Sequence, residues 1–257
     1  MDKLSEETTQ KIDAYWSSAL GCRLEDLTTP GLALIARTGL GEYHGILLFA
    51  RGNSLVVSVP PSRMNVLRER FKDLTPADLQ STEKLKSLIQ YPVEEIVGPA
   101  YLGYVDAGTF QAKPQTGARM LTVDDNTEFE KLREACPPED WEYGGSYLGE
   151  HALAGQFAPD GSLLAMAGYS VWNHSIAHIS VLTHPAHRGF GLGSGVVNSI
   201  TTHALQQGLI PQYRTLCRNQ PSMSIATSLG FRLYAYSTAV RLQRPRNTPV
   251  EVLPDDA

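Results

Sequence analysis

The chain has 257 residues, 42% hydrophobic and 19% charged, a composition that excludes a disordered or fibrous protein. Its 22 Lys and Arg residues against 27 Asp and Glu residues give a formal charge of −5, so the basic surplus of a general nucleic-acid binder is absent. The polar N-terminus is unlike a signal peptide, and no apolar run approaches the ~18–20 residues of a membrane span. Three cysteines lack the spacing of a zinc site or a disulfide framework. We therefore expect a cytoplasmic protein without nucleic-acid or membrane partners.

The first half of the sequence alternates between helical and strand patterns. Apolar residues at helical spacing predict a helix over 5–19, which Ser5 can cap. The pattern then predicts three strands (32–38, 44–51, 54–59), two helices (64–74, 76–89) and a strand (97–104). A polar stretch without apolar period over 107–118 marks a domain boundary. We assign residues 1–112 to an N-terminal α/β domain of unknown role.

The second half continues the mixture of strands and helices. The predicted elements, in order, are strand 119–123, helix 126–136, an aromatic loop 137–147, strands 151–158, 163–172 and 175–183, helix 193–207, strand 213–217, helix 221–229 and strand 232–241. The remaining residues, 242–257, are polar and contain prolines, which predicts a flexible tail.

A glycine-rich loop between a strand and a helix is the most informative stretch. Glycines let backbone N–H groups approach an anion, and the start of the helix adds partial positive charge. No Gly-Lys-Ser/Thr follows as in a Walker loop, and the spacing of a dinucleotide fingerprint fails. The stretch does fit Arg-x-x-Gly-x-Gly, as Arg188, Gly191 and Gly193. A phosphate or pyrophosphate is the expected ligand.

This loop resembles the coenzyme A pyrophosphate loop of the GNAT superfamily of N-acetyltransferases. A second match, from Asn219 to Leu229-Gly230-Phe231, resembles a late helix of that family at the expected distance. The resemblance covers residues 118–241 and implies an α+β fold, a mixed, mostly antiparallel sheet flanked by helices. The order of elements in 1–112 also allows a degenerate copy of this fold.

The resemblance implies acetyl-CoA as co-substrate, and the residue spacing predicts no metal site. The resemblance assigns the pyrophosphate to the loop, the pantetheine arm to the preceding strand, and Asn219 to a place beside that arm. The implied cofactor-binding residues are Val181, Leu182, Thr183, Arg188, Gly189, Phe190, Gly191, Leu192, Gly193, Ser194, Asn219 and Ser222. The implied reaction is direct attack by an amine, with a strand N–H polarising the thioester carbonyl.

The sequence departs from the family at one position that has a catalytic role in many members. Many members carry a tyrosine seven residues after the asparagine, as an acid for the leaving thiolate, and here that position is Ala226. Ser222, one helical turn earlier, could donate instead, and Tyr234 or Tyr236 are alternatives. The other interpretation of Ser222 is a small residue that lets the helix pack.

A general base has several candidates. His178 lies within the strand before the loop and is the preferred one, although it can also be a core histidine. Its neighbour His174 lies ~13 Å away if the segment is a strand, which excludes a shared metal. Glu142 and Glu150, in the aromatic loop that lines the acceptor pocket in the family, could bind or deprotonate an amine, or could simply be solvated.

These observations predict an acetyl-CoA-dependent N-acetyltransferase that transfers an acyl group to a primary amine of a small molecule. Two alternatives remain open: an enzyme that acetylates protein amino groups, and a non-catalytic acyl-CoA-binding sensor, which the Ala226 departure allows. A homodimer is compatible with the sequence but no feature requires it.

Overall fold

The computed structural model describes residues 3–37, 45–114, 117–149 and 152–243. The chain divides into two compact units: unit 1 comprises 1–16 and 100–236, and unit 2 comprises 17–99 and 237–257. These bounds differ from the predicted division at 112–118, because the first helix and the last strand each contribute to both units. The assignment of sequence domains stays a prediction. None of the described helices is long and apolar enough to cross a membrane.

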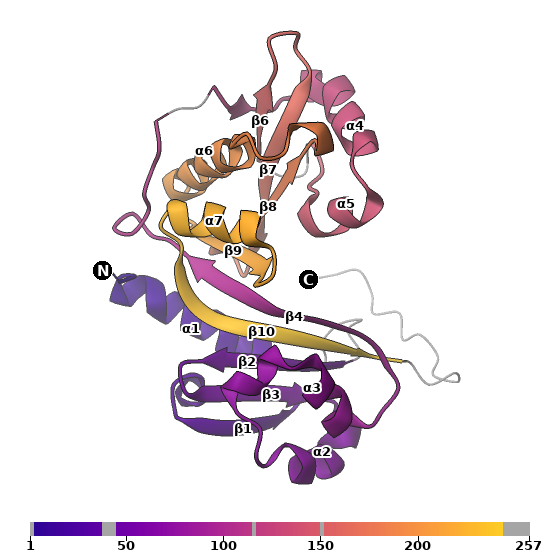
Figure 1. The fold of residues 1–257 in the computed structure, drawn as a ribbon. Helices are drawn as coiled ribbons and strands as arrows, with labels where there is room; N and C mark the ends of the chain where they lie inside the picture. Colours follow the sequence, from indigo (N-terminus) through magenta and orange to yellow (C-terminus); the bar gives the residue numbers. More distant parts are fainter. Residues whose placement is uncertain (1–2, 38–44, 115–116, 150–151, 244–257) are drawn as a thin grey trace. The chain divides into compact units, whose positions relative to one another are not determined.

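Unit 2 is a small α/β unit. Its sheet has the order β1-β3-β2, in which β1 runs parallel and β2 antiparallel to the fully buried β3. The elements are η1 (Leu24–Leu27), β1 (Gly31–Ala36), β2 (Gly45–Arg51), β3 (Ser54–Val59), η2 (Pro61–Arg63), α2 (Met64–Phe71), η3 (Pro76–Gln80) and α3 (Thr82–Ile89). Figure 1 shows α2 and α3 beside this sheet.

The prediction of a single helix over 76–89 is wrong, because these residues form two separate elements. A 3₁₀ turn ends at Gln80, and α3 begins afresh at Thr82, because the Ser81 hydroxyl accepts the Lys84 N–H at 3.2 Å and caps the new helix. The predicted end of the first strand, at residue 38, and the predicted start of the second, at residue 44, lie outside the described residues.

Unit 1 holds the second half of the chain and the start of α1. Its sheet has the order β4-β9-β8-β7-β6-β5 and is mixed, with one parallel pair, β8 and β9. The elements are α1 (Glu6–Leu20), β4 (Val93–Tyr104), β5 (Arg119–Met120), η4 (Val123–Asp125), α4 (Asn126–Ala135), α5 (Pro138–Gly144), β6 (Leu153–Phe157), β7 (Leu163–Trp172), β8 (Ile176–Thr183), η5 (Pro185–His187), α6 (Leu192–Gln206), β9 (Ile210–Leu216), α7 (Gln220–Ser228) and β10 (Arg232–Leu242). β4 and β10 each continue into unit 2.

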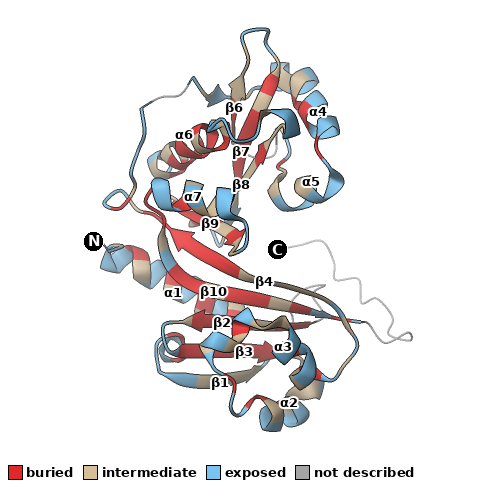
Figure 2. Ribbon diagram, in the orientation of Figure 1, coloured by how far each residue is buried: buried red, intermediate tan, exposed pale blue. Residues whose placement is uncertain are grey.

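Two apolar clusters cover opposite faces of the unit 1 sheet, with α6 and α7 on one face and α4 and α5 on the other (Figures 1 and 2). Residues opposite one another in neighbouring strands share a face, so the pair Ala167 and Val181 contacts the α6 cluster. The next pair, Met166 and Leu182, packs in the α4 cluster. The mixed sheet flanked by helices is the fold that the sequence predicted.

The predicted aromatic loop 137–147 is largely helical. α5 begins at Pro138, and Glu139 and Asp140 follow in its first turn, where both residue types favour a helix start. Those signals were present in the sequence, but seven residues are too few for an apolar period to become visible. The predicted strand 119–123 is also shorter, because a capping box between Thr122 and Asp125 begins a 3₁₀ turn.

A buried asparagine fastens the chain that precedes β5 to α6. Asn198 is 4% exposed, and its carboxamide oxygen accepts the Lys113 N–H at 2.8 Å while its Nδ2 donates to the Lys113 carbonyl at 3.3 Å. The Asn198 side chain therefore satisfies both backbone polar groups of Lys113, as a neighbouring strand would.

Replacing Asn198 by Ala removes both bonds and leaves polar backbone groups against a buried helix face. We expect the free energy of unfolding to fall by about 1–2 kcal/mol. Urea denaturation measures this, with Gln206→Ala on the exposed end of the same helix as the control, expected within ~0.5 kcal/mol of the parent. Equal effects of the two variants would contradict the anchoring role.

Candidate active site

The parallel strands β8 and β9 separate part-way along their length. Their pairing runs from Ile176 and Ile210 to Ile179 and Tyr213, and it ends there although β8 continues to Thr183 and β9 to Leu216. On its other edge, β8 stays paired with β7 as far as Thr183. Residues 180–183 of β8 therefore present one edge whose backbone groups have no strand partner among the described residues. The predicted residues Val181, Leu182 and Thr183 all lie on this edge.

A glycine loop connects the open end of β8 to α6. Gly189 and Gly191 have φ values of +85° and +79°, which L side chains rarely adopt. Gly191 is the N-cap of α6, and no side chain caps this helix. The N–H groups of residues 192–194 therefore lack partners within the helix and make its start an anion-binding feature. A Cβ added at Gly191 meets no described atom within 4 Å, so the space beside the N-cap is open.

The other loop residues divide between packing and exposure. Gly193 is buried in the first turn of α6, where an added Cβ would come within 3.2 Å of Ile225 and 3.3 Å of Thr183. Leu192 packs partly against the α6 cluster, whereas Phe190 is 78% exposed.

Arg188 is engaged by protein groups. Its Nη2 forms an ion pair with Asp140 Oδ2 at 2.6 Å, and its Nε donates to the Thr183 carbonyl at 3.3 Å. These contacts tie the loop to α5 and to the end of β8. Arg188 thus orients the loop in this structure, and the N–H groups at the start of α6 remain the donors without a partner within the helix. The sequence analysis did not identify Asp140 as a partner of Arg188, because it lies 48 residues earlier in the chain.

Lys113 is a second residue that sequence reasoning missed. Its ammonium donates to the hydroxyls of Ser194, in the first turn of α6, and Ser228, at the end of α7, at 3.0 and 2.9 Å. No carboxylate pairs with it in the described ranges. A cation thus stands beside the positive end of α6. It could not be recognised from the sequence, because Lys113 lies in a polar segment 81 residues before Ser194.

The start of α7 contains the second predicted motif. Asn219 is the N-cap, and its side-chain oxygen accepts the Ser222 N–H at 3.2 Å. The Ser222 hydroxyl lies 2.8 Å from the hydroxyl of Tyr213, which sequence reasoning did not single out. Ala226, one turn further on, is fully buried. The structure therefore brings Ser222 close to the point where β8 and β9 part, on the α6 and α7 face.

His178 lies on the opposite face of the sheet, at the penultimate paired position of β8. Its Nδ1 is 2.7 Å from Gln212 Oε1, and the Gln212 amide donates to the Tyr104 hydroxyl, which also accepts the Trp16 indole N–H at 2.7 Å. Because the amide nitrogen of Gln212 is used by Tyr104, its oxygen faces the histidine, and Nδ1 carries the hydrogen. Nε2 is then the unprotonated nitrogen.

The environment of His178 makes it neutral and weakly basic. Its ring stacks on Trp172 with centroids 4.0 Å apart, and Trp172 in turn stacks on Tyr15. Burial, with a smaller contribution from the positive charge of Arg214, lowers the pKa of His178 to about 4, against the opposing effect of the Gln212 hydrogen bond. The role of His178 as a base stays a prediction.

The predicted acceptor segment lies on the same face as His178. Ser146, just after α5, contacts the Ser180 hydroxyl, and Gly144 lies against the Val181 carbonyl with no room for a side chain. Trp141 and the exposed Tyr147 meet edge to face at 5.8 Å. Glu142 is exposed on α5, and Glu150 lies outside the described residues.

The two alternative tyrosines of β10 differ in position. The Tyr234 hydroxyl donates to Asp13 of α1 at 2.5 Å and its ring meets Tyr104 edge to face, so it lies on the His178 face. Tyr236 packs partly against the α6 cluster.

Comparison with known proteins identifies this arrangement. A family model described as GNAT acetyltransferase matches residues 139–238, which include the loop, the open strand edge and α7. This segment is a GNAT acetyltransferase domain. The resemblance inferred from the two motifs is thereby confirmed, and the enzyme class of the family, acetyltransferase, is the predicted one.

Solved structures at low identity are also similar to the chain. One is a putative acetyltransferase of the GNAT family from Novosphingobium aromaticivorans, with 24% identity, covering 60% of this chain and 67% of that one at a TM-score of 0.46. Another, a GNAT-family acetyltransferase from Colwellia psychrerythraea, has 18% identity, 63% and 62% coverage and a TM-score of 0.48.

A GCN5-related N-acetyltransferase-like protein from Streptococcus suis has 16% identity, covers 91% of this chain and 98% of that one, and has a TM-score of 0.46. The chain spans about two thirds or less of the length of the first two structures. No curated protein matches the sequence significantly.

The GNAT fold generally uses acetyl-CoA as co-substrate, and the residues of this domain fit that group. The fit rests on the uncapped start of α6, the open space at Gly191 and the unpaired edge of β8. Among the described residues, no group of three or more His, Cys, Asp or Glu side chains could hold a metal ion.

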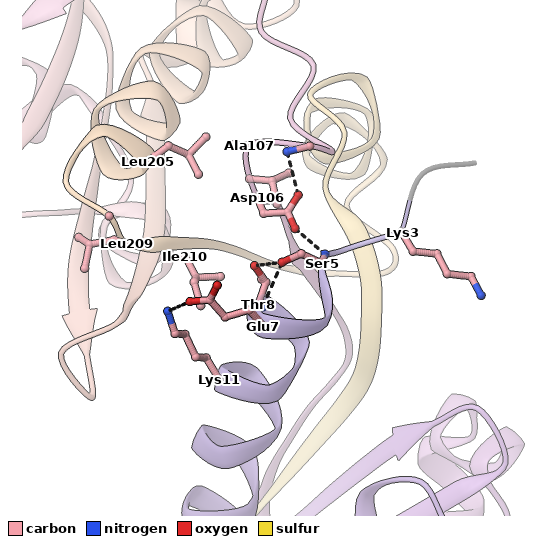
Figure 3. Close-up of a pocket in the computed structure, with 13 residues that line it drawn as sticks. Lys3, Ser5, Glu7, Thr8, Lys11, Asp106, Ala107, Leu205, Leu209 and Ile210 are labelled. Atoms are coloured by element: carbon pink, nitrogen blue, oxygen red, sulfur yellow. Dashed lines mark hydrogen bonds and ion pairs between the residues drawn. The ribbon is translucent and has the colours of Figure 1, made fainter.

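A pocket of about 460 Å³ lies at the other end of α6, away from this site (Figure 3). Its wall includes Ser5, which precedes α1, Lys11 of α1, the turn at Asp106 and the end of α6 at Leu205. Asp106 accepts hydrogen bonds from Ser5, Gly108 and Thr109, and Lys11 pairs with Glu7 at 2.7 Å. None of the predicted site residues lines this pocket.

The low pKa of His178 predicts a pH-dependent stability of the GNAT domain. Between pH ~6.5 and ~4 the histidine is protonated in the unfolded chain but neutral in the folded one, so acid lowers the free energy of unfolding. Lowering the pH from 7 to 4.5 should remove ~2.5 kcal/mol through this residue.

Urea denaturation at the two pH values should therefore show a smaller acid loss for His178→Gln than for the parent protein. The exposed His174, changed to Asn, is the control and should keep the parental loss. An equal acid loss in the parent and in His178→Gln would mean that His178 is not held neutral.

Proposed function

We propose that the chain is an acetyl-CoA-dependent N-acetyltransferase that transfers an acyl group to a primary amine of a small molecule by direct attack. The observation that carries this proposal is the end of β8–β9 pairing at Ile179 and Tyr213, while both strands continue. An unpaired strand edge inside a sheet needs hydrogen-bond partners. The amide groups of a pantetheine arm supply them.

The backbone of the glycine loop would hold the pyrophosphate. The N–H groups at the start of α6 and its dipole favour negative charge there, and Arg188, anchored on Asp140, keeps the loop in place. Lys113 adds a fixed positive charge near the same turn. Bound acetyl-CoA supplies the activated acyl group, in the form of a thioester.

The acceptor amine would approach from the face that carries His178 and Ser180. This face offers the aromatic rings of Trp141 and Tyr147, and the exposed carboxylate of Glu142 lies on the same helix as Trp141. A backbone N–H of the open β8 edge would polarise the carbonyl, and holding both substrates in one seam removes much of the entropic barrier. The net charge of −5 is compatible with a cationic acceptor.

A non-catalytic acyl-CoA sensor is the second candidate, because fully buried Ala226 leaves the usual tyrosine position without a proton donor. A protein amino group as acceptor is the remaining alternative, and amine specificity decides between it and a small molecule.

The enzymatic proposal predicts steady release of free thiol from acetyl-CoA in the presence of a suitable amine. A colorimetric thiol assay across a panel of small primary amines, with a lysine-containing peptide as comparison, measures it. Turnover with the peptide alone would support a protein acceptor. Tight binding of CoA without thiol release for any acceptor in the panel would support the non-catalytic sensor.

The loop assignment has its own test in a matched pair of glycines. Gly191→Ala should raise the dissociation constant of CoA tenfold or more, because the new methyl group occupies the open space beside the N-cap, which the pyrophosphate would need to approach the helix N–H groups. Gly208, with φ +72° and equally open surroundings just beyond the other end of α6, provides the control variant Gly208→Ala.

Both substitutions impose similar backbone strain, about 1–2 kcal/mol, so the two variants should lose similar stability. Calorimetric titration should nevertheless separate them. If Gly191→Ala binds CoA as tightly as Gly208→Ala does, the start of α6 is not the pyrophosphate site.

A further inference from the structure

Tyr213 is a buried tyrosine at the point where β8 and β9 part. It is the last β9 residue paired with β8, and only 2% of its surface is exposed. Its side chain lies on the α6 and α7 face, where the ring packs 5.3 Å from that of Phe231 in the cluster that contains Ala226. The phenol therefore belongs to the wall between the open seam and α7.

The hydrogen of this phenol has one described acceptor. The Tyr213 hydroxyl lies 2.8 Å from Ser222 Oγ and makes no other hydrogen bond in the described part of the chain. A buried hydroxyl that does not donate costs about 1–3 kcal/mol. Tyr213 is thus the donor and Ser222 Oγ the acceptor.

This assignment decides where the Ser222 hydrogen points. The serine is half-buried in the first turn of α7, and its backbone N–H is fixed by the Asn219 side chain. No described group accepts its hydroxyl hydrogen. With one lone pair held by Tyr213, the hydroxyl has its hydrogen directed away from the phenol and available to a ligand.

Ala226 explains why the phenol comes from β9. Ala226 is fully buried, with 0% of its surface exposed, and it belongs to the same cluster as the Tyr213 ring. A tyrosine at 226 would therefore need space that the buried cluster does not offer, whereas the Tyr213 ring reaches that cluster from the sheet.

We propose that Tyr213 is a positioning residue that holds the Ser222 hydroxyl as the hydrogen-bond donor to the departing sulfur of CoA. This inference rests on the proposed function. In the step concerned, the amine nitrogen bonds to the carbonyl carbon, the carbon–sulfur bond breaks, and its electron pair goes to sulfur. The ammonium proton passes to solvent water, and the Ser222 O–H stabilises the thiolate without being lost.

The ionisation of Tyr213 agrees with this role. Burial raises the pKa of Tyr213 to about 12, against the opposing effect of the Ser222 hydrogen bond. The phenol therefore keeps its proton throughout the pH range of an acetyltransferase assay, and Ser222 is oriented in the same way at every pH.

The test compares two ligands that differ only at sulfur, CoA and desulfo-CoA, at a pH where the thiol is largely ionised. Tyr213→Phe removes the hydroxyl and keeps the ring. It should weaken CoA binding about three- to tenfold and leave desulfo-CoA binding within about twofold, because a hydrogen bond to a charged group is lost. Ser222→Ala should give the same pattern, and the double variant no further loss.

Tyr101→Phe is the matched control. Tyr101 is buried in the same cluster, but its hydroxyl donates to the Phe231 carbonyl at 2.7 Å instead of to Ser222. This variant should lose similar stability and bind both ligands as the parent does. The kcat should fall for Tyr213→Phe with little change in the KM for acetyl-CoA.

Equal weakening of CoA and desulfo-CoA by Tyr213→Phe would overturn the inference, as would additive losses in the double variant. If Tyr213→Phe fails to fold, the test rests on Ser222→Ala. That variant must then bind CoA more weakly than the parent does while binding desulfo-CoA equally well. Unaltered discrimination in these variants refutes the role of Tyr213 while leaving the proposed function standing. A parent protein that binds neither ligand refutes the proposed function, and this inference with it.

Discussion

The separation of β8 from β9 is the constraint on which the rest of the site depends. Four residues of β8 keep their hydrogen bonds to β7 and lose those to β9, so a row of backbone groups inside unit 1 is left for a ligand. Backbone polar groups are seldom left unpaired in folded proteins. The glycine loop begins where this edge ends, which places an anion site and an extended hydrogen-bonding edge in sequence along one path.

The sheet also separates two kinds of chemistry. Along β8, alternate side chains face the α6 cluster or the α4 and α5 helices, so neighbouring residues serve different sides. The face of α6 and α7 carries Tyr213 and Ser222, which are suited to a leaving group. The opposite face carries His178, Ser180 and the aromatic segment at Trp141, which are suited to an acceptor. A thioester in the seam would be reachable from both.

Charge at the start of α6 is organised by contacts between distant residues. Arg188 is neutralised by Asp140, whereas Lys113 is held by two hydroxyls and keeps its charge without a described counterion. The helix start and Lys113 together favour a doubly charged ligand group over a neutral one. The buried Asn198 holds the backbone of Lys113, so this cation has a defined position although its side chain is on the surface.

The sequence by itself determined most of the order of elements, the glycine loop and the helix that follows Asn219, because glycine spacing, capping residues and apolar periods are local properties. It also located the departure at Ala226. It could not reveal α5, whose seven residues are shorter than a readable period, or the break at Ser81. Only the tertiary structure decided the partners of Lys113, Arg188 and Ser222. Those contacts join residues that are remote in sequence, and strand register and helix packing bring them together. The same holds for His178, whose neutral state follows chiefly from burial, with Trp172 stacked on its ring.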